Sequence, residues 1–195
     1  NIFKITEEIH QILNDYALDL EGEMQLVTVF DQADSVDERI NGFLSNLFFG
    51  ILLVGLVIFM SLGFRASMLV IIAIPLSILI GLGFVDMTGF GLQQMSIAGL
   101  IISLGLLVDN SIVIVENIER FIGLGNTKND AAVKGSVQLG WPIITATVTT
   151  MLAFIPIIAM PDKAGRFIQS MPVTVIYTLF ASLCIALLLT PYLAK

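Results

Sequence analysis

The stretch INGFLSNLFFGILLVGLVIFMSLGF, residues 40–64, contains no charged side chain. An α-helix needs about 20 mostly apolar residues to cross the hydrocarbon core of a bilayer, and this stretch supplies them. The apolar run ends where Gly63 and Phe64 lead into Arg65. We therefore predict a membrane-spanning helix over residues 42–63, and this helix decides the fold class of the chain.

Further apolar stretches follow it, and they explain the composition of the whole chain. The 195 residues are 56% hydrophobic and 13% charged, with a mean hydropathy of +0.94, whereas soluble proteins carry about 25% charged residues. Pro75 lies inside the second stretch, where neighbouring helices can satisfy the carbonyl that it frees. We predict an all-α polytopic membrane protein whose region 35–195 holds five spans, at about residues 42–63, 66–86, 92–121, 141–160 and 167–194. Before the fourth span, which we expect to open at Trp141 and Pro142, a polar connection carries a short helical piece around Lys128 and Lys134.

Residues 1–34 form a polar head with a short α/β character. A helical spacing of apolar side chains predicts an amphipathic helix, formed by Ile5, Ile9, Ile12, Leu13 and Tyr16. Residues 24–30 are rich in Val, Thr and Phe and predict a strand. One helix and one strand cannot bury a core, so we expect the head to be the end of a soluble domain and the sequence to begin partway through a longer protein. Ser35, with Glu38 three residues later, predicts a capping box at the start of the helix that leads to the membrane.

Charge and rare residues exclude several function classes. Ten of the sixteen acidic residues lie between Glu7 and Glu38, and no basic stripe exists to neutralise phosphates, which argues against nucleic acid. The single cysteine, Cys184, excludes a disulfide framework within the chain. The single histidine, His10, is expected to be solvated and cannot hold a metal alone. Without a Ser-His-Asp set or an H-E-x-x-H pair we expect no enzymatic activity, no metal and no organic cofactor.

The basic residues predict how the spans are oriented, since cytoplasmic loops carry an excess of Lys and Arg. One side of the predicted membrane region carries Arg65, Arg120, Lys128, Lys134 and Lys195. The other side carries Lys4, Arg39, Lys163 and Arg166. We place the first group in the cytoplasm, so the acidic head faces outward.

Asp109 is the main candidate for function, because it interrupts the third span in SLGLLVDNSIVIVEN, residues 103–117. A charged residue at the centre of a membrane helix costs about 2.5–3.5 kcal/mol on insertion scales. Burial disfavours the charged form of a carboxyl group, and such a group can load and release a proton near neutral pH. The alternative is a structural hydrogen bond from Asp109 to a neighbouring helix, a need that a neutral residue would meet at lower cost.

Other polar residues of the spans have two interpretations each. Asn110 cannot take a proton and either positions Asp109 or fills a helix contact. Glu116, seven residues after Asp109 and on the same face, either extends a proton path or is solvated at the end of the helix. Gly99, Ser103 and Gly105 would allow another helix to approach closely. Hydroxyls in the fourth span either serve the path or, as we expect, bond back to their own helix, namely those of Thr145, Thr147, Thr149 and Thr150.

The stretch GLLVDNSIVIVENIER, Gly105 to Arg120, resembles the fourth transmembrane helix of resistance-nodulation-division transporters, with its G-x-x-x-D element and I-V-x-x-E-N tail. Three more stretches resemble the family's third, fifth and sixth helices, namely residues 64–79, 153–160 and 187–195. Residues 24–36 resemble the last part of its first periplasmic porter region. The five spans would then correspond to the family's second to sixth.

The resemblance implies a proton-driven exporter of drugs or other amphiphilic compounds in a bacterial inner membrane, with residues 1–34 in the periplasm and protons as the coupling ion. Full-length members have two repeated halves, act commonly as trimers, and in Gram-negative bacteria join a periplasmic adaptor and an outer-membrane channel. In drug-exporting members two adjacent Asp of this helix pair with a Lys from the second half. Here Asp109 matches the first and Asn110 replaces the second, and the predicted spans contain no Lys or Arg except Arg120 at the end of the third.

A second interpretation is a lipid-binding module. The same five-helix block in related eukaryotic proteins is the sterol-sensing domain, which also carries G-x-x-x-D. On this hypothesis the chain would bind lipid without transport.

Overall fold

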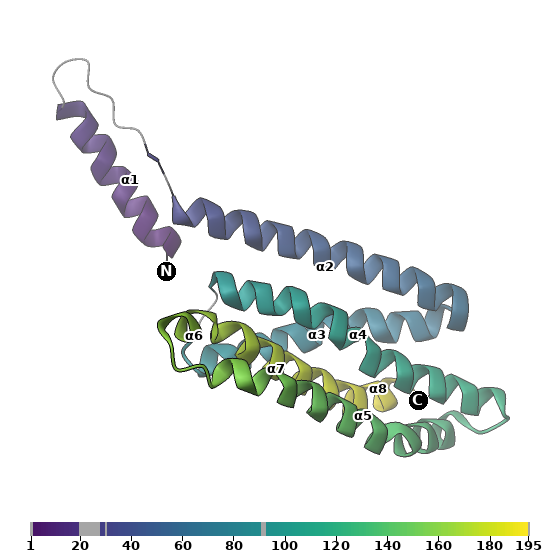
Figure 1. Ribbon diagram of the computed structural model, residues 1–195. Coiled ribbons are helices and arrows are strands. Elements are labelled where there is room, and N and C mark those ends of the chain that lie inside the picture. The colour runs from purple at the N-terminus through teal and green to yellow at the C-terminus, as the bar shows by residue number, and fades with distance from the viewer. Residues whose placement is uncertain (1, 20–27, 30, 91–92, 195) are drawn as a thin grey trace. The chain divides into compact units, whose positions relative to one another are not determined.

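The computed structural model describes residues 2–19, 28–29, 31–90 and 93–194. Within these ranges it contains helices and no strand, and the chain divides into two compact units, Asn1–Gly42 and Phe43–Lys195. The helices are drawn in Figure 1. Five helical stretches are long and apolar enough to cross a membrane. The predicted all-α polytopic membrane fold is therefore confirmed.

The first unit contains α1 (Ile2–Asp19) and the beginning of α2 (Gln32–Leu62). The apolar stripe predicted for α1 is present, and its side chains are exposed at Ile5, Ile9, Ile12 and Tyr16. The strand predicted at residues 24–30 lies outside the described residues, except for Thr28 and Val29, which belong to neither a helix nor a strand. The boundary predicted after residue 34 lies inside α2, which continues from the first unit into the second.

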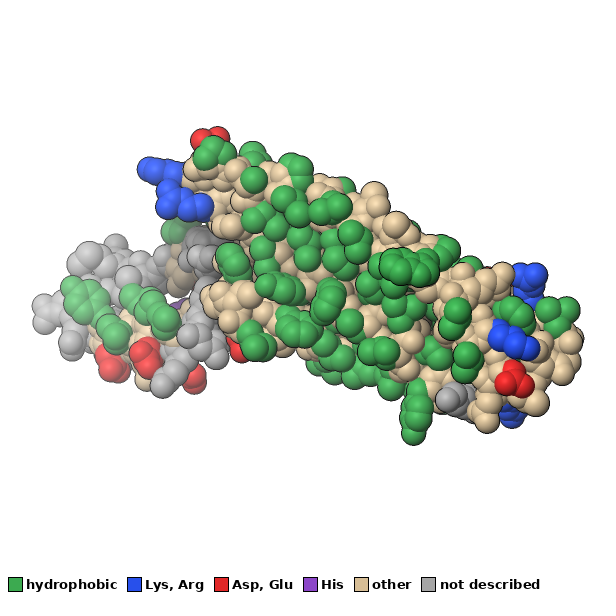
Figure 2. Space-filling model, turned by 90° about the horizontal axis from the view of Figure 1, so that it is seen from below, with side chains coloured by type: hydrophobic (Ala, Val, Ile, Leu, Met, Phe, Trp, Pro, Cys, Tyr) green, Lys and Arg blue, Asp and Glu red, His purple; other side chains and the backbone are tan. Residues whose placement is uncertain are grey.

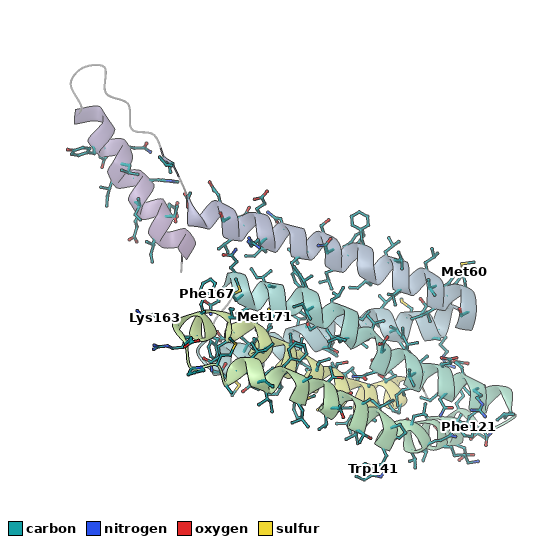
Figure 3. The ribbon with its side chains drawn as sticks, in the orientation of Figure 1. Met60, Phe121, Trp141, Lys163, Phe167 and Met171 are labelled. Carbon is teal, nitrogen blue, oxygen red and sulfur yellow. The ribbon has the colours of Figure 1, made fainter. Side chains whose placement is uncertain are left out.

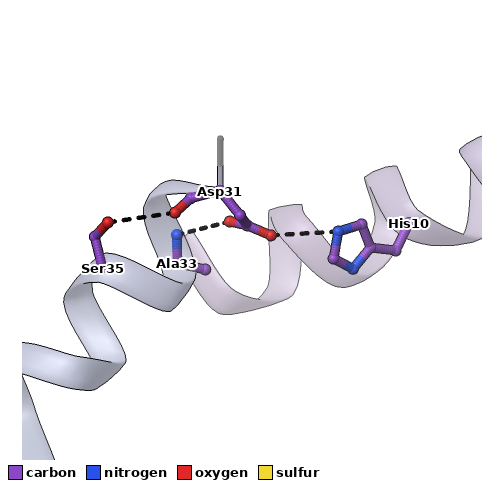
Figure 4. A network of polar contacts seen from close by, with 4 residues as sticks. All are labelled: His10, Asp31, Ala33 and Ser35. Atoms are coloured by element: carbon purple, nitrogen blue, oxygen red, sulfur yellow. Dashed lines mark hydrogen bonds and ion pairs between the residues drawn. The ribbon is translucent and has the colours of Figure 1, made fainter. Parts of the chain in front are cut away.

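Asp31, rather than Ser35, caps the start of α2 (Figure 4). The backbone N–H of Ala33 donates to Asp31 Oδ1 at 2.8 Å, so the helix begins before the predicted capping box. Ser35 then lies inside the first turn, and its hydroxyl donates back to the Asp31 carbonyl at 3.5 Å. The other carboxylate oxygen, Oδ2, lies 3.3 Å from His10 Nε2. The capping-box prediction was wrong because a carboxylate four residues earlier takes the role of the cap.

The second unit is a bundle of long helices. After α2 come α3 (Phe64–Met87), α4 (Gln94–Gly123) and α5 (Lys128–Ile158), and α3, α4, α5 and α7 (Ser170–Cys184) lie side by side. Gly63 and Gly125 adopt φ values of 87° and 88° in the turns before α3 and α5. Only glycine adopts such values without a steric cost, so these two residues make the sharp reversals possible.

The fourth long helix differs from the prediction, because α5 begins at Lys128 and runs through Trp141 and Pro142 without a break. Thr127 caps it, with its Oγ1 accepting from the Asp130 N–H at 3.3 Å and donating to Asp130 Oδ2 at 2.8 Å. The proline does not divide the segment in two, and the turns before it pack against α4. There the Gly135 carbonyl accepts a hydrogen bond from Asn117 Nδ2 at 2.9 Å.

The last span is a nearly continuous rod with an irregular end. It consists of α6 (Lys163–Ile168), α7, the π-helical segment η1 (Ile185–Leu189) and α8 (Thr190–Leu193). The wider turn of η1 directly precedes Thr190, whose hydroxyl donates to the Ile185 carbonyl at 3.2 Å. Pro191 has no N–H to donate to a preceding turn. The rod therefore changes its helical geometry at one defined place.

The outer surface of the second unit is apolar between two charged ends. Figure 2 shows hydrophobic side chains over the visible face of the bundle, with Lys, Arg, Asp and Glu gathered toward its ends. Large apolar side chains are exposed, for example Met60 at 80% and Leu188 at 74%. Figure 3 places Lys163 and Phe167 at one end of the bundle and Phe121 at the other. An apolar belt of this extent would promote aggregation in water, and it suits a helical bundle surrounded by lipid.

Among the described helices, α4 and α7 share the most extensive contact, which we name the α4–α7 seam. Every fourth residue of α7 carries a small hydroxyl and is buried, namely Ser170, Thr174, Thr178 and Ser182. Facing them, a Cβ added at Gly99 of α4 would lie 2.6 Å from the Met171 carbonyl oxygen. A Cβ added at Gly81 of α3 would lie 2.8 Å from the Thr178 Cα. Since both distances are shorter than any van der Waals contact, only glycine permits this approach of α7.

Gly99→Ala should therefore destabilise the bundle. The added methyl group meets backbone rather than a flexible side chain, and overpacking of this kind costs about 1–3 kcal/mol. The measurement is the free energy of unfolding of the full-length protein in detergent. Gly105→Ala is the matched control on the same helix, because a Cβ there meets nothing within 4 Å. Equal stability of the two variants would contradict this account of the seam.

Candidate functional site

Asp109 lies close to the middle of α4, on its exposed side. Among the described residues its carboxylate has no hydrogen-bond or ion-pair partner, and it contributes to the walls of two cavities. No three His, Cys, Asp or Glu side chains of the described ranges are grouped as a metal site would require. The structural hydrogen bond considered as an alternative for Asp109 is absent from this part of the chain.

The first cavity, which we name the α2–α4 cavity, has a volume of about 340 Å³. Three helices line it, with Gly50, Ile51 and Val54 from α2, Ile74 from α3, and Leu104, Gly105, Val108, Asp109 and Ile112 from α4. Asp109 is the only polar side chain in this lining. The cavity is therefore an apolar space with one carboxylate in its wall.

The second cavity, which we name the α4–α7 cavity, has a volume of about 150 Å³ and a different chemistry. Its lining comes from α4, α5 and α7 and comprises Leu106, Asp109, Asn110, Ala146, Thr147, Thr150 and Leu179. Besides the carboxylate it contains one amide and two hydroxyls. Asp109 therefore lies between the two cavities, of which one is apolar and the other polar.

Asn110, the residue after Asp109, connects α4 to α5 and α7. Its Oδ1 accepts a hydrogen bond from Thr147 Oγ1 of α5 at 3.2 Å, and its Nδ2 donates to Ser182 Oγ of α7 over a long 3.5 Å. Ser182 Oγ in turn donates to the Leu107 carbonyl of α4 at 3.1 Å. We name these residues the Asn110 junction. It holds α4 in register with α5 and α7 directly after Asp109.

The Asn110 junction contradicts the prediction for Thr147 and includes Ser182, which the sequence analysis did not name. Thr145, Thr149 and Thr150 donate to carbonyls of their own helix, as expected for this group. Thr147 does not, because it faces α4 and finds the Asn110 amide there. Ser182 was not singled out from the sequence. The four-residue spacing that begins at Ser170 was a usable signal for it, since that spacing marks one face of a helix.

Glu116 and Asn117, adjacent residues about two turns after Asp109 on α4, lie in different environments. Glu116 is exposed and has no partner among the described residues, while the neighbouring Asn117 is buried. Asn117 Nδ2 donates to the Gly135 carbonyl at 2.9 Å and to Gln138 Oε1 at 3.2 Å. Asn117 therefore fastens α4 to α5, a role that the sequence alone did not indicate. The structure brings no polar group of the Asn110 junction to Glu116.

The three predicted packing residues also differ from one another. Gly99 lies in the α4–α7 seam, and Ser103 is buried and donates to the Leu100 carbonyl of its own helix at 2.9 Å. Gly105 lines the α2–α4 cavity instead, and an added Cβ there would meet nothing within 4 Å. The close approach predicted at Gly105 is absent within the described chain, because α2 stands away from α4 at this level.

The comparisons with known proteins agree with the resemblance of residues 105–120. The sequence model of the AcrB/AcrD/AcrF family matches residues 1–195. The chain is 28% identical over 194 residues to the multidrug resistance protein MdtC of Pectobacterium atrosepticum, and 29% identical over 194 residues to that of Pectobacterium carotovorum. Each alignment covers 99% of this chain and 19% of the relative. An uncharacterised transporter of Haemophilus influenzae is 28% identical over 196 residues, which cover 100% of this chain and 19% of that protein.

The chain thus spans 19% of the length of these relatives. The family match, in contrast, extends from the first residue to the last. The predicted resemblance to resistance-nodulation-division transporters is confirmed, and the chain belongs to the AcrB/AcrD/AcrF family of membrane transporters.

Proposed function

We propose that this chain is the proton-coupling transmembrane segment of an inner-membrane, proton-driven pump that exports drugs or other amphiphilic compounds. The observation that carries the proposal is the position of Asp109, a carboxylate in the middle of an apolar helix without an ion-pair partner among the described residues. The name of the two MdtC relatives supports multidrug export as the activity of the full-length protein.

The carboxyl group would work by changing its charge inside the bundle. Charged, it faces an apolar cavity on one side and needs a counter-charge or polar groups from elsewhere; protonated, it is neutral and fits the apolar surroundings. Each state therefore favours a different arrangement of the helices around α4. One proton moving inward across 100 mV releases about 2.3 kcal/mol, which can drive such a change once per cycle.

The polar α4–α7 cavity is the side from which a proton would reach Asp109. It brings the amide of Asn110 and the hydroxyls of Thr147 and Thr150 next to the carboxylate. Asn110 itself cannot bind a proton in this pH range, so its part is to fix the position of α4. Glu116, two turns further along α4, would lie at the end of the path or outside it.

The remaining assignments follow from the family and complete the proposal. The full-length protein would act as a homotrimer in the bacterial inner membrane, with residues 1–34 in a periplasmic porter region. A periplasmic adaptor and an outer-membrane channel would be its partners. The cation that pairs with Asp109 would come from a helix outside this chain, since the predicted spans contain no Lys or Arg except Arg120, which lies eleven residues further along the same helix.

Asp109→Asn in the full-length protein should reduce proton-driven efflux to the background of vesicles that lack the protein. The amide keeps the size of the side chain but cannot load a proton. The measurement is substrate efflux from membrane vesicles after an imposed pH gradient, at matched expression. Asp86→Asn, the same change on an exposed residue in the last turn of α3, is the control and should pump normally.

Normal pumping by the Asp109→Asn protein would refute the proposal. If such a protein also bound sterol, the lipid-binding module would be favoured instead. Glu116→Gln, measured in parallel, decides between the two interpretations of that residue, because a solvated residue at the end of a helix can lose its charge without loss of efflux.

Thr147→Val should lower the free energy of unfolding by about 0.5–1.5 kcal/mol, the net value of a typical hydrogen bond. The substitution removes the hydroxyl that donates to Asn110 Oδ1 and leaves that oxygen without its donor. Thr149→Val is the matched control on the same helix, because its hydroxyl bonds only to the Thr145 carbonyl. If both variants unfold alike, the Asn110 junction does not stabilise the bundle.

A further inference from the structure

Ser182 of α7 makes two hydrogen bonds to α4, and the two partners lie on either side of Asp109 in the sequence. Its hydroxyl donates to the Leu107 carbonyl at 3.1 Å and accepts from Asn110 Nδ2 at 3.5 Å. The side chain is fully buried, at 0% exposure. In the part of the chain that the structure describes, these are the hydrogen bonds that join α4 to α7 at the level of Asp109.

The hydrogen bonds of the Asn110 junction all run in one direction. Thr147 donates to Asn110, Asn110 donates to Ser182, and Ser182 donates to the Leu107 carbonyl. A hydroxyl has one proton to donate, and Ser182 uses it for Leu107. Residue 110 must therefore supply the donor for the bond between them. An amide can do so and a carboxylate cannot, which explains why Asn suits this position beside Ser182.

These two bonds also determine where Asp109 points. Leu107 and Asn110 are three residues apart, so they share one face of α4, and this face lies against α7. Successive residues of an α-helix are turned by about 100°. Asp109 is therefore directed away from this face, and it lines both cavities. A rotation of α4 that carried Asp109 further into either cavity would have to break both bonds of Ser182.

We propose that Ser182 is a positioning residue for Asp109, because its hydroxyl fixes the rotation of α4 and so holds the carboxyl group between the α2–α4 cavity and the α4–α7 cavity. Ser182 bonds to the neighbours of Asp109 and not to its carboxylate, so a cation from a helix outside this chain can still pair with that group. The effect on transport rests on the proposed function. A misplacement of about 1 Å can lower the rate of a reaction about 100-fold, so the position of a proton-carrying group matters.

The test is NMR of the full-length protein in lipid bilayers, with an isotope label on the aspartate carboxyl groups. The signal of Asp109 is the one that disappears in Asp109→Asn. Ser182→Ala removes both bonds to α4 and adds no atom, so we expect the Asp109 signal to shift or split. Proton-driven efflux by the same variant should fall about two- to tenfold, the effect of losing one hydrogen bond.

Two control variants separate positioning from a general loss of stability. Thr178 lies one turn before Ser182 and is also buried, but its hydroxyl donates to the Thr174 carbonyl of its own helix. Thr178→Val should therefore leave the Asp109 signal and efflux unchanged. Gly99→Ala weakens the α4–α7 seam about 15 Å along α4 from Asp109. This variant should unfold more easily and still give the Asp109 signal of the unaltered protein.

An unchanged Asp109 signal in Ser182→Ala would overturn the proposal. An equal shift of the signal in Gly99→Ala would overturn it too, because a general weakening of the bundle would then explain the effect. Where Asp109→Asn has stopped efflux, normal efflux by Ser182→Ala would also count against it. The NMR signal does not depend on pumping, so failure of this positioning role and failure of proton coupling can be told apart.

Discussion

The structure depends on one constraint, which is that backbone N–H and C=O groups within lipid must find their partners inside the protein. Long helices meet this requirement, and they leave side chains as the only means of holding one helix against the next. In this chain the residues that hold the helices together are small. Glycines at positions 81 and 99 bring backbones together, and short hydroxyl and amide side chains make the few bonds between helices. Apolar side chains, which have no strong preference between lipid and protein, cover the rest.

Asp109 differs from the other polar residues of α4 because no described residue of the bundle makes a hydrogen bond or ion pair with its carboxylate. Asn110 and Asn117, on the same helix, are each held by neighbours on α5 or α7. Asp109 is left between two cavities. Helix α4 is thus bonded to its neighbours through the amides of Asn110 and Asn117, while the Asp109 carboxylate is unpaired within the described chain. A shift of α4 that follows a change in the charge of Asp109 would therefore also move α5 and α7.

The sequence predicted the elements well and their contacts poorly, for a physical reason. Charge-free runs of sufficient length are a direct consequence of the lipid environment, so the five spans could be located from residue types alone. The starts of α2 and α5 were harder to predict because several residues near each start could begin the helix. Asp31 rather than Ser35 caps α2, and α5 begins well before Pro142. The cost of a charge in lipid singled out Asp109. Its surroundings could not be inferred, because Gly99 and Gly105 are chemically identical and differ only in whether a second helix faces them, and Thr147 differs from Thr145 only in the side of α5 on which it lies.

The π-helical segment η1 has a geometric consequence for the whole last rod. At about 3.6 residues per turn, positions four apart drift around a helix by about 40° per step, so a stripe with that spacing soon leaves its partner. Yet Ser170, Thr174, Thr178, Ser182, Ala186 and Thr190 are all buried. The wider turn of η1 lies late in this series, and it offsets this drift for Ala186 and Thr190. The last turns of the rod thereby keep Ala186 and Thr190 inside the bundle, where both are buried.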